Sequence, residues 1–346
     1  MEKKSLKDIS WQVTESEYRA DSALSYSTLA RYEREGFNGL DKLFEKAESP
    51  SLVFGSAVDT LITGSEEEFN SLFMVAQLDN PLSDALITIT KRLFSIYGKI
   101  YDSLQYFEDS VILEAIEDIS WNNHWLPKTR VKKIKEECAP YYKLLFLSEG
   151  KTIISSYVYQ DVLNTVDKLK SADATKFYFE QDNIFDNNIE RLNQLKFKST
   201  FDNINYRCMS DLLICIHDKK VVVPVDLKTS YKPEWDFYKS FLEWRYDIQA
   251  RLYWKIIRDN MDRDPYFKDF KLADYRFIVA NKKTLTPLVW IFENTNSKEP
   301  IITKDNIELR YPTVIGEELK YYFDSKPAVP KGIDEVKPNV INNFII

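Results

Sequence analysis

Two charged residues follow a strongly apolar run in the middle of the sequence. Residues 221–230 read VVVPVDLKTS, so Asp226 and Lys228 stand two positions apart directly after a β-branched stretch. A run of this kind is typical of a buried β-strand, in which alternate residues point to the same face. Asp226 and Lys228 are therefore expected on one face, with Leu227 on the other.

A third charged residue, Asp211, comes into register with this pair if the segment between the two strands is a tight turn. Asp218 and Lys219 are then the two central turn residues. Counting back along both arms places Asp211 opposite Asp226, with Cβ atoms about 4.5–5.5 Å apart. A slip of one residue would send the two carboxylates to opposite faces. Pro224 cannot donate a ladder hydrogen bond, and it indicates a bulge or an edge position in this hairpin.

Two buried carboxylates side by side need either a shared proton or a cation. Mg²⁺ prefers oxygen ligands and is often held by one or two carboxylates together with water and substrate phosphate. An ammonium group one strand step away is suited to contact a scissile phosphate or to hold an attacking water. These groups match the requirements of metal-assisted phosphodiester cleavage, in which fixed positive charge stabilises the developing negative charge.

Strands and one long helix must position these groups. After about residue 186 the sequence alternates like a series of strands, then becomes helical at 234–259 and returns to two strands. The expected order is β–β–β–α–β, followed by a last helix. The segments that carry this prediction are LNQLKFKST, YRCMSDLLICI, VVVPVDLKTS, YRFIVANK, PLVWIFEN and EELKYYFDS.

The N-terminal half has mainly helical periodicity. Helices are expected at 25–48, with Ser25 or Ser27 as N-cap and a turn at Gly36–Gly39, at 53–63 and 66–74, and over much of 84–180. The fold class is therefore α/β (α+β), with a central mixed sheet flanked by helices. We expect one domain over 1–346, made of a mostly helical part (1–180), a β-rich core (186–295) and a C-terminal segment (296–346).

The composition excludes several classes of protein. The chain has 346 residues, 44% of them hydrophobic, so a disordered chain is excluded. Its net charge of −7 argues against a protein that coats nucleic acid by charge alone. The N-terminus lacks an apolar signal segment, and three cysteines without C-x-x-C spacing indicate free thiols and no four-cysteine cluster. We expect a cytoplasmic protein with no membrane contact, in a bacterial host cytoplasm if the gene is phage-encoded.

The order Asp211, then Asp226-Leu227-Lys228 on the next strand, resembles the PD-(D/E)XK nuclease core. More narrowly, the chain is similar to phage-type exonucleases of the lambda exonuclease and exodeoxyribonuclease VIII kind. FGSAVDTLI at 54–62 resembles an early helix of that family, and YDIQARLY at 246–253 resembles its Q-x-x-x-Y helix. KTIISSYVYQDVLNTVDKL at 151–169 resembles the helix before its sheet. The likeness extends over residues 25–290 in the expected order.

The resemblance implies a restriction-endonuclease-like core and a site for Mg²⁺, with Mn²⁺ as a substitute. Asp211 and Asp226 would hold the metal, helped by the Leu227 carbonyl and by Asp59, which stands where the family usually has histidine. Lys228 would position water or stabilise the phosphate. The other expected site residues are Gln249 and Tyr253, four residues apart on one helix face, and Glu190, which stands about where the family has an acidic residue.

The expected substrate is the double-stranded DNA end, resected in phage-type recombination. A single-strand annealing protein is the expected partner, and a homo-oligomer the expected assembly. Two alternatives remain open at this stage: a site-specific or CRISPR-associated endonuclease of the same fold, and a non-catalytic member that binds DNA or protein.

Each residue also has a purely structural interpretation. Asp226 and Lys228 could form an ordinary ion pair on a strand, and Asp59 could bond to a backbone amide. His124 and His217 are expected to be structural or solvated, with His217 in the predicted turn. Aromatic residues at 231–238 offer a surface for base stacking or ordinary packing. The basic residues expected along a DNA path, each of which could equally lie on a solvated face, are Lys196, Lys198, Arg207, Lys232, Lys239, Arg245 and Arg251.

Overall fold

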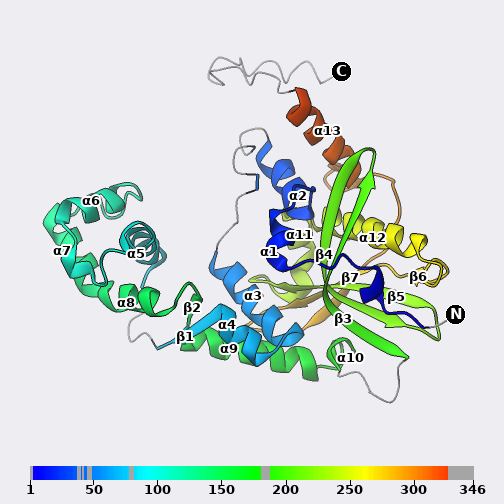
Figure 1. Cartoon of the computed structure of the whole chain (residues 1–346), viewed down its shortest axis with the longest axis horizontal. Coiled ribbons are helices and arrows are strands. Elements are labelled where there is room, and N and C mark those ends of the chain that lie inside the picture. The colour runs from blue at the N-terminus through cyan, green and yellow to red at the C-terminus, as the bar shows by residue number, and fades with distance from the viewer. Residues whose placement is uncertain are drawn as a thin grey trace. The chain divides into compact units, whose positions relative to one another are not determined.

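The computed structural model describes residues 3–36, 40, 43–44, 49–77, 82–180 and 188–325. The chain forms two compact units (Figure 1), each described here by itself. The first comprises Met1–Ala47, Asp173–Ala280 and Pro287–Ile346, and the second comprises Glu48–Ala172 and Asn281–Thr286. Whether the two act as a single nuclease domain stays a prediction.

A mixed sheet with strand order β3-β4-β5-β7-β8 forms the centre of the first unit, and β6 pairs beside β5. β3, β4 and β5 are antiparallel, β5 and β7 are parallel, and β8 returns antiparallel. The strands are β3 (Ile189–Phe201), β4 (Ile204–Ile216), β5 (Val221–Thr229), β6 (Lys271–Leu272), β7 (Tyr275–Ala280) and β8 (Leu288–Phe292). The expected α/β class with a central mixed sheet is confirmed.

Helix α12 (Tyr246–Arg263) packs on this sheet, where it contacts β3, β4 and β7. A parallel connection such as β5 to β7 needs a crossover, and α12 supplies it. The buried face of α12 includes Ile248, Leu252 and Ile256, which join Phe197, Phe277 and other sheet residues in one core. Gln249 lies on this helix, so the crossover also positions the Gln249 side chain against the β4–β5 hairpin.

The remaining elements of the first unit are helices and a separate two-stranded antiparallel sheet. They are η1 (Leu6–Ile9), α1 (Glu15–Ala20), α2 (Tyr26–Glu35), α10 (Lys176–Phe179), η4 (Glu234–Asp236), α11 (Phe237–Glu243), β9 (Ile301–Ile302), β10 (Glu308–Leu309) and α13 (Pro312–Ser325). The expected last helix is confirmed as α13. Ser25 is the N-cap residue of α2, and the helix ends at Gly36, whose φ of 60° favours glycine. The rest of the predicted turn, 37–39, lies outside the described residues.

The second unit is mostly helical, as the periodicity predicts. Its elements are α3 (Pro50–Thr63), α4 (Glu66–Leu72), β1 (Phe73–Ala76), α5 (Asp84–Tyr97), η3 (Leu104–Tyr106), α6 (Asp109–Glu117), α7 (Pro127–Glu137), α8 (Ala139–Leu147), β2 (Thr152–Ser155) and α9 (Ser156–Ser171). The parallel pair β1–β2 was not expected, because strands of four residues are too short to show a periodicity.

Two expectations from composition concern single residues and single helices. All three cysteines, Cys138, Cys208 and Cys215, are free and buried, as their spacing indicated. Among the helices within the described ranges, none combines the length and the apolar character needed to cross a membrane.

Candidate active site

The β4–β5 hairpin brings Asp211 and Asp226 together. Leu212 pairs with Val225 and Ile216 with Val221, which is the register expected from a turn centred on Asp218 and Lys219. Continued by one residue beyond the last ladder pair, this register puts Asp211 opposite Asp226. At this point the Asp211 side chain replaces a backbone acceptor: its Oδ2 accepts a hydrogen bond from the Leu227 N–H at 3.0 Å. The predicted register is confirmed.

Pro224 is accommodated in the middle of the sheet rather than at its edge. β5 lies between β4 and the parallel strands β6 and β7. β6 pairs with Val221 and Val222, and β7 begins pairing only at Val225. Within the described residues, Val223 and Pro224 have no partner on that side, so the proline lies at the break between β6 and β7. Of the two positions expected from the sequence, a bulge or an edge, the edge is wrong, because β5 is a central strand and the interruption lies between its neighbours β6 and β7.

Asp226 is the most enclosed of the charged residues at this site. Its side chain is 1% exposed, and its Oδ1 lies 2.5 Å from Lys228 Nζ. Its Oδ2 accepts a hydrogen bond from the Gln249 Nε2 of α12. Gln249 is itself 4% exposed, and its Oε1 has no hydrogen-bond partner within the described part of the chain. The site therefore contains a buried carboxylate, an ammonium group and an amide oxygen that is available to a further ligand.

Lys228 stays protonated at this position. Burial acts to lower the pKa of its ammonium group, but the charges of Asp226, Tyr246 and Asp211 outweigh burial and raise the pKa above its usual value. The ammonium also lies 4.6 Å from the centre of the Tyr246 ring, a cation–π distance. An amine held in this way is a fixed positive charge and not a proton acceptor near neutral pH.

Tyr253 lies one helical turn beyond Gln249, in the core under the hairpin. Its side chain is 7% exposed, and its ring centre is 6.4 Å from that of Tyr275. Burial, followed by the charges of neighbouring groups that include Asp226 and Asp211, raises the pKa of Tyr253 well above its usual value. Its hydroxyl is therefore a neutral group close to the two carboxylates, and its role in the site stays a prediction.

Glu190 is not part of this cluster, although both lie in the first unit. Glu190 pairs with Cys215, four residues along β4 from Asp211, which is about 13 Å at the usual strand rise. The structure thus separates Glu190 from the carboxylate pair, since β3 runs antiparallel to β4 and meets it near the turn. Asp59 lies on α3 in the second unit, so its role as a metal ligand stays a prediction.

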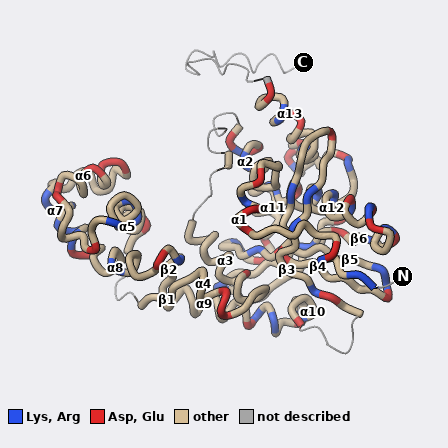
Figure 2. The backbone as a smooth tube through the Cα atoms, viewed as in Figure 1, with Lys and Arg blue, Asp and Glu red and all other residues tan. Residues whose placement is uncertain are grey.

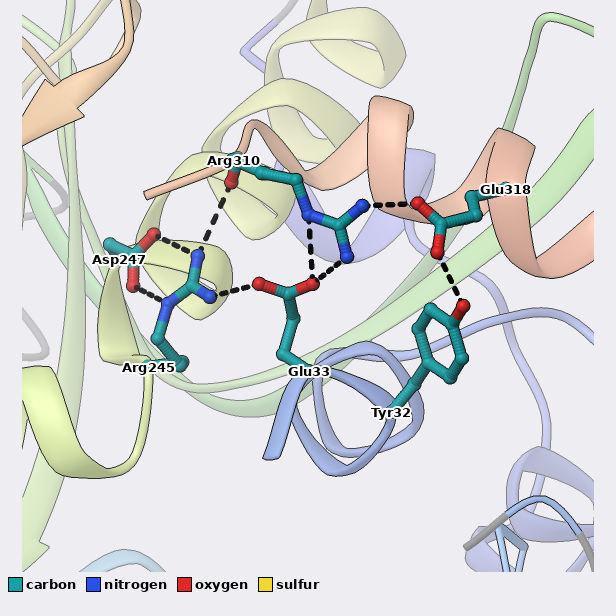
Figure 3. Close-up of polar contacts among 6 residues, drawn as sticks. All are labelled: Tyr32, Glu33, Arg245, Asp247, Arg310 and Glu318. Carbon is teal, nitrogen blue, oxygen red and sulfur yellow. Dashed lines mark hydrogen bonds and ion pairs between the residues drawn. The ribbon is translucent and has the colours of Figure 1, made fainter. Parts of the chain in front are cut away.

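A charged network secures the start of α12 (Figure 3). Arg245, the N-cap residue, has a left-handed backbone with φ of 55°, and its guanidinium bonds both to Asp247 and to Glu33 of α2. Arg310 joins the same Glu33 and also Glu318 of α13. Arg245 was expected along a DNA path, but two carboxylates already engage it. Its contribution is to hold the first turn of the helix that carries Tyr246 and Gln249.

Most of the other predicted basic residues are also engaged within the protein. Lys198 pairs with Asp21, Lys232 with Glu243 and Lys239 with Asp236, while Arg207 bonds to the Tyr18 carbonyl and Arg251 to the Glu299 carbonyl. Figure 2 shows basic and acidic residues interspersed along the chain. The partners of Lys198, Arg207 and Arg251 are distant in the sequence, so no local pattern could reveal those pairings.

Aromatic residues do lie exposed just after β5. Tyr231, Trp235 and Tyr238 are 63%, 60% and 49% exposed, respectively. Phe237, between them in sequence, is buried against Phe277 and Trp290. The segment 231–238, which begins three residues after Lys228 in the sequence, is thus anchored by one aromatic side chain and presents three others to solvent.

Comparisons with known proteins add little to this geometry. A scan against protein-family models found no match, and a search of curated proteins found none. Among solved structures, the chain is similar to a crystal structure named "Putative exonuclease" from Eubacterium rectale. The identity is 14%, the match covers 91% of this chain and 85% of that chain, and the TM-score is 0.41. A TM-score of this size carries no conclusion, so we base the function proposed below on the arrangement of Asp211, Asp226 and Lys228.

Proposed function

We propose that the chain is a metal-dependent deoxyribonuclease that resects double-stranded DNA ends as an exonuclease. The observation that carries this proposal is the hairpin of β4 and β5, which places Asp211, Asp226 and Lys228 on the face covered by α12. This arrangement agrees with the PD-(D/E)XK pattern that the sequence resembles. The roles in phage-type recombination, with an annealing protein as partner and a homo-oligomer as assembly, rest on the resemblance alone.

The residues present fit a hard divalent cation such as Mg²⁺, for which Mn²⁺ can substitute. Asp211 and Asp226 offer carboxylate oxygens, and the unpartnered Oε1 of Gln249 offers a buried oxygen beside them. The Leu227 carbonyl and Asp59 are further candidate ligands. When bound, the metal would lower the pKa of a water molecule and stabilise the oxygens of the displacement.

The protein's own groups have distinct tasks in this proposal. Lys228 keeps its positive charge and stabilises the negative charge that develops on the phosphate. Gln249 orients the Asp226 carboxylate through its amide N–H, and Tyr246 limits where the Lys228 ammonium can lie. The exposed aromatic residues at 231–238 are positioned to stack on unpaired bases of a DNA end.

The test compares linear duplex DNA with covalently closed circles, in Mg²⁺, in Mn²⁺ and with a chelator. We expect degradation of the linear form only, dependent on the metal. Lys228→Met should slow cleavage by about 100- to 1,000-fold, as expected for loss of one group that stabilises the transition state. Asp226→Asn should be similarly impaired. Lys320→Met, which alters an exposed lysine paired with Asp324 on α13, is the matched control and should cleave normally.

Other outcomes would point elsewhere. Cutting of closed circles would replace the exonuclease by an endonuclease. DNA retention without cleavage, unchanged in the Asp226 and Lys228 variants, would leave a binding protein. Cleavage that persists at full rate in both variants, with circular dichroism showing intact folds, would refute the assignment of the site.

A further inference from the structure

Three side chains that commonly bind metals meet at the turn end of the β4–β5 hairpin. Glu190 pairs across the strands with Cys215, and His217 follows two residues later. One donor atom from each of the three lies within 4.8 Å of the other two. The Cys215 side chain is fully buried, and those of His217 and Glu190 are 7% and 26% exposed. Of the two positions expected for His217, structural or solvated, the solvated one is wrong, because the structure buries its ring.

The hydrogen bonds around this cluster leave one potential metal-ligand atom without a hydrogen bond on Glu190 and one on His217. Glu190 Oε1 accepts a hydrogen bond from Ser5 Oγ at 2.5 Å, and His217 Nδ1 lies 3.1 Å from the Tyr266 hydroxyl and 3.8 Å from Cys215 Sγ. The remaining atoms, Glu190 Oε2 and His217 Nε2, are buried, lie 3.7 Å apart and have no hydrogen bond within the described residues. Metal ligands in proteins show this pattern, in which the second polar atom is held by an outer partner.

A simple ion pair between Glu190 and His217 explains the cluster less well. A separation of 3.7 Å is too long for a hydrogen bond. Lys3 lies near enough to act on His217 and opposes a cation here, but two anionic ligands would outweigh one lysine.

We propose that Glu190, Cys215 and His217 form a Zn²⁺ site, with the Glu190 Oε2, Cys215 Sγ and His217 Nε2 as ligands and water in the fourth position. A thiolate and an imidazole favour Zn²⁺ over Mg²⁺. In a tetrahedral site with Zn–N and Zn–O near 2.1 Å, the two ligand atoms lie about 3.4 Å apart. Glu190 and His217 therefore need to approach by only a few tenths of an ångström.

The site is separate from the carboxylate pair and does not depend on the proposed nuclease activity. Binding would displace the Cys215 proton to solvent, and two anionic ligands would neutralise the metal charge. The bound ion would join β3, the end of β4 and, through Ser5, the N-terminal segment. Its expected consequence is a more stable first unit.

The experiment titrates the metal-stripped full-length chain with Co²⁺, which reports on a Zn²⁺ site by its absorption. We expect one equivalent to bind with a thiolate-to-Co²⁺ charge-transfer band that Zn²⁺ abolishes and Mg²⁺ does not. Cys215→Ala should remove the band completely. Cys208→Ala is the matched control, because Cys208 is an equally buried cysteine on the same strand. It should bind Co²⁺ like the parent chain.

A second variant and a second readout protect the test against misfolding. His217→Gln should weaken Co²⁺ binding and change the ligand-field spectrum, and Zn²⁺ should raise the Tm of the parent and Cys208→Ala chains but not of Cys215→Ala. Absence of the charge-transfer band in the parent chain would overturn the proposal. A band that survives in Cys215→Ala, or that disappears equally in Cys208→Ala, would also overturn it.

Discussion

Replacing Lys228 by methionine should strongly destabilise the first unit in metal-free buffer. Asp226 is 1% exposed and lies 2.5 Å from the Lys228 ammonium, so the variant leaves a buried carboxylate without its cation. Removing one partner of a buried ion pair costs about 3–5 kcal/mol of unfolding free energy. Gln249 still donates to Asp226, and the Lys228 side chain keeps 17% exposure, so we expect the lower end, about 3 kcal/mol.

The same reasoning predicts a rescue. In the double variant Asp226→Asn/Lys228→Met no unpaired charge remains at position 226, so much of the lost stability should return. The coupling energy between the two sites should then be about 2–3 kcal/mol, within the range of contacting residues. Mg²⁺ should stabilise Lys228→Met more than the parent chain, because a bound cation replaces the missing ammonium.

Urea unfolding followed by tryptophan fluorescence measures these differences. Trp121 and Trp125 lie in the second unit, and replacing both by phenylalanine makes the signal specific for the first. Lys320→Met is the control and should change stability by less than about 1 kcal/mol, since its ion pair is exposed. The reasoning is refuted if Lys228→Met is as stable as Lys320→Met. A double variant no more stable than Lys228→Met would refute it equally.

Three further predictions concern the first unit. Burial acts to raise the pKa of Asp264, but hydrogen bonds from Lys4 and two backbone amides outweigh it and lower the pKa. The ionised Asp264 carboxylate therefore stabilises the fold fully above about pH 4, and this stabilisation is lost as the pH falls through the lower folded-state pKa. In urea unfolding, Asp264→Asn should be less stable than the parent chain by about 1–2 kcal/mol at pH 7, and this difference should disappear in acid. A deficit independent of pH would contradict this. Gly316→Ala would place a Cβ 2.1 Å from the Tyr206 hydroxyl, so the variant should lose about 1–3 kcal/mol of unfolding free energy. Adding Tyr206→Phe to this variant should recover part of the loss. Equal melting temperatures of the single and double variants would count against the packing argument. Glu33→Gln should cost about 3 kcal/mol in urea unfolding, because the 9%-exposed carboxylate neutralises two arginines, and a change below about 1 kcal/mol would show the network to be dispensable.

The hairpin shows how far local sequence reaches. Alternation of side chains and a turn at Asp218 and Lys219 were sufficient to align Asp211 with Asp226, because an antiparallel register follows from the turn by counting. The same counting, from a two-residue turn at Asp202 and Asn203, places Glu190 opposite Cys215, but no turn was expected at these two residues. Both residues have positive φ, as the favoured two-residue hairpin turns require.

The contacts of the basic residues, by contrast, could not be predicted from the sequence. A lysine or arginine in a sequence looks the same whether it meets a phosphate or a carboxylate, and Arg245 meets Glu33, over 200 residues away in the chain. Pro224 is a similar case, because its tolerance in a central strand depends on the break between β6 and β7. Glu33 is far from Arg245 in the sequence, and β6 and β7 are far from Pro224, so no local pattern could indicate these contacts.

By itself, the sequence determined the α/β class, the order of the strands and the alignment of two aspartates with a lysine. Those properties follow from periodicities of two and 3.6 and from turn geometry, which act over a few residues. The tertiary structure alone decided that Gln249 meets Asp226, that Tyr246 confines Lys228, and that His217 turns inward beside Cys215 and Glu190. These contacts depend on how α12 and β3 pack against the hairpin, and burial there sets which charges are retained and which atoms remain available for a ligand.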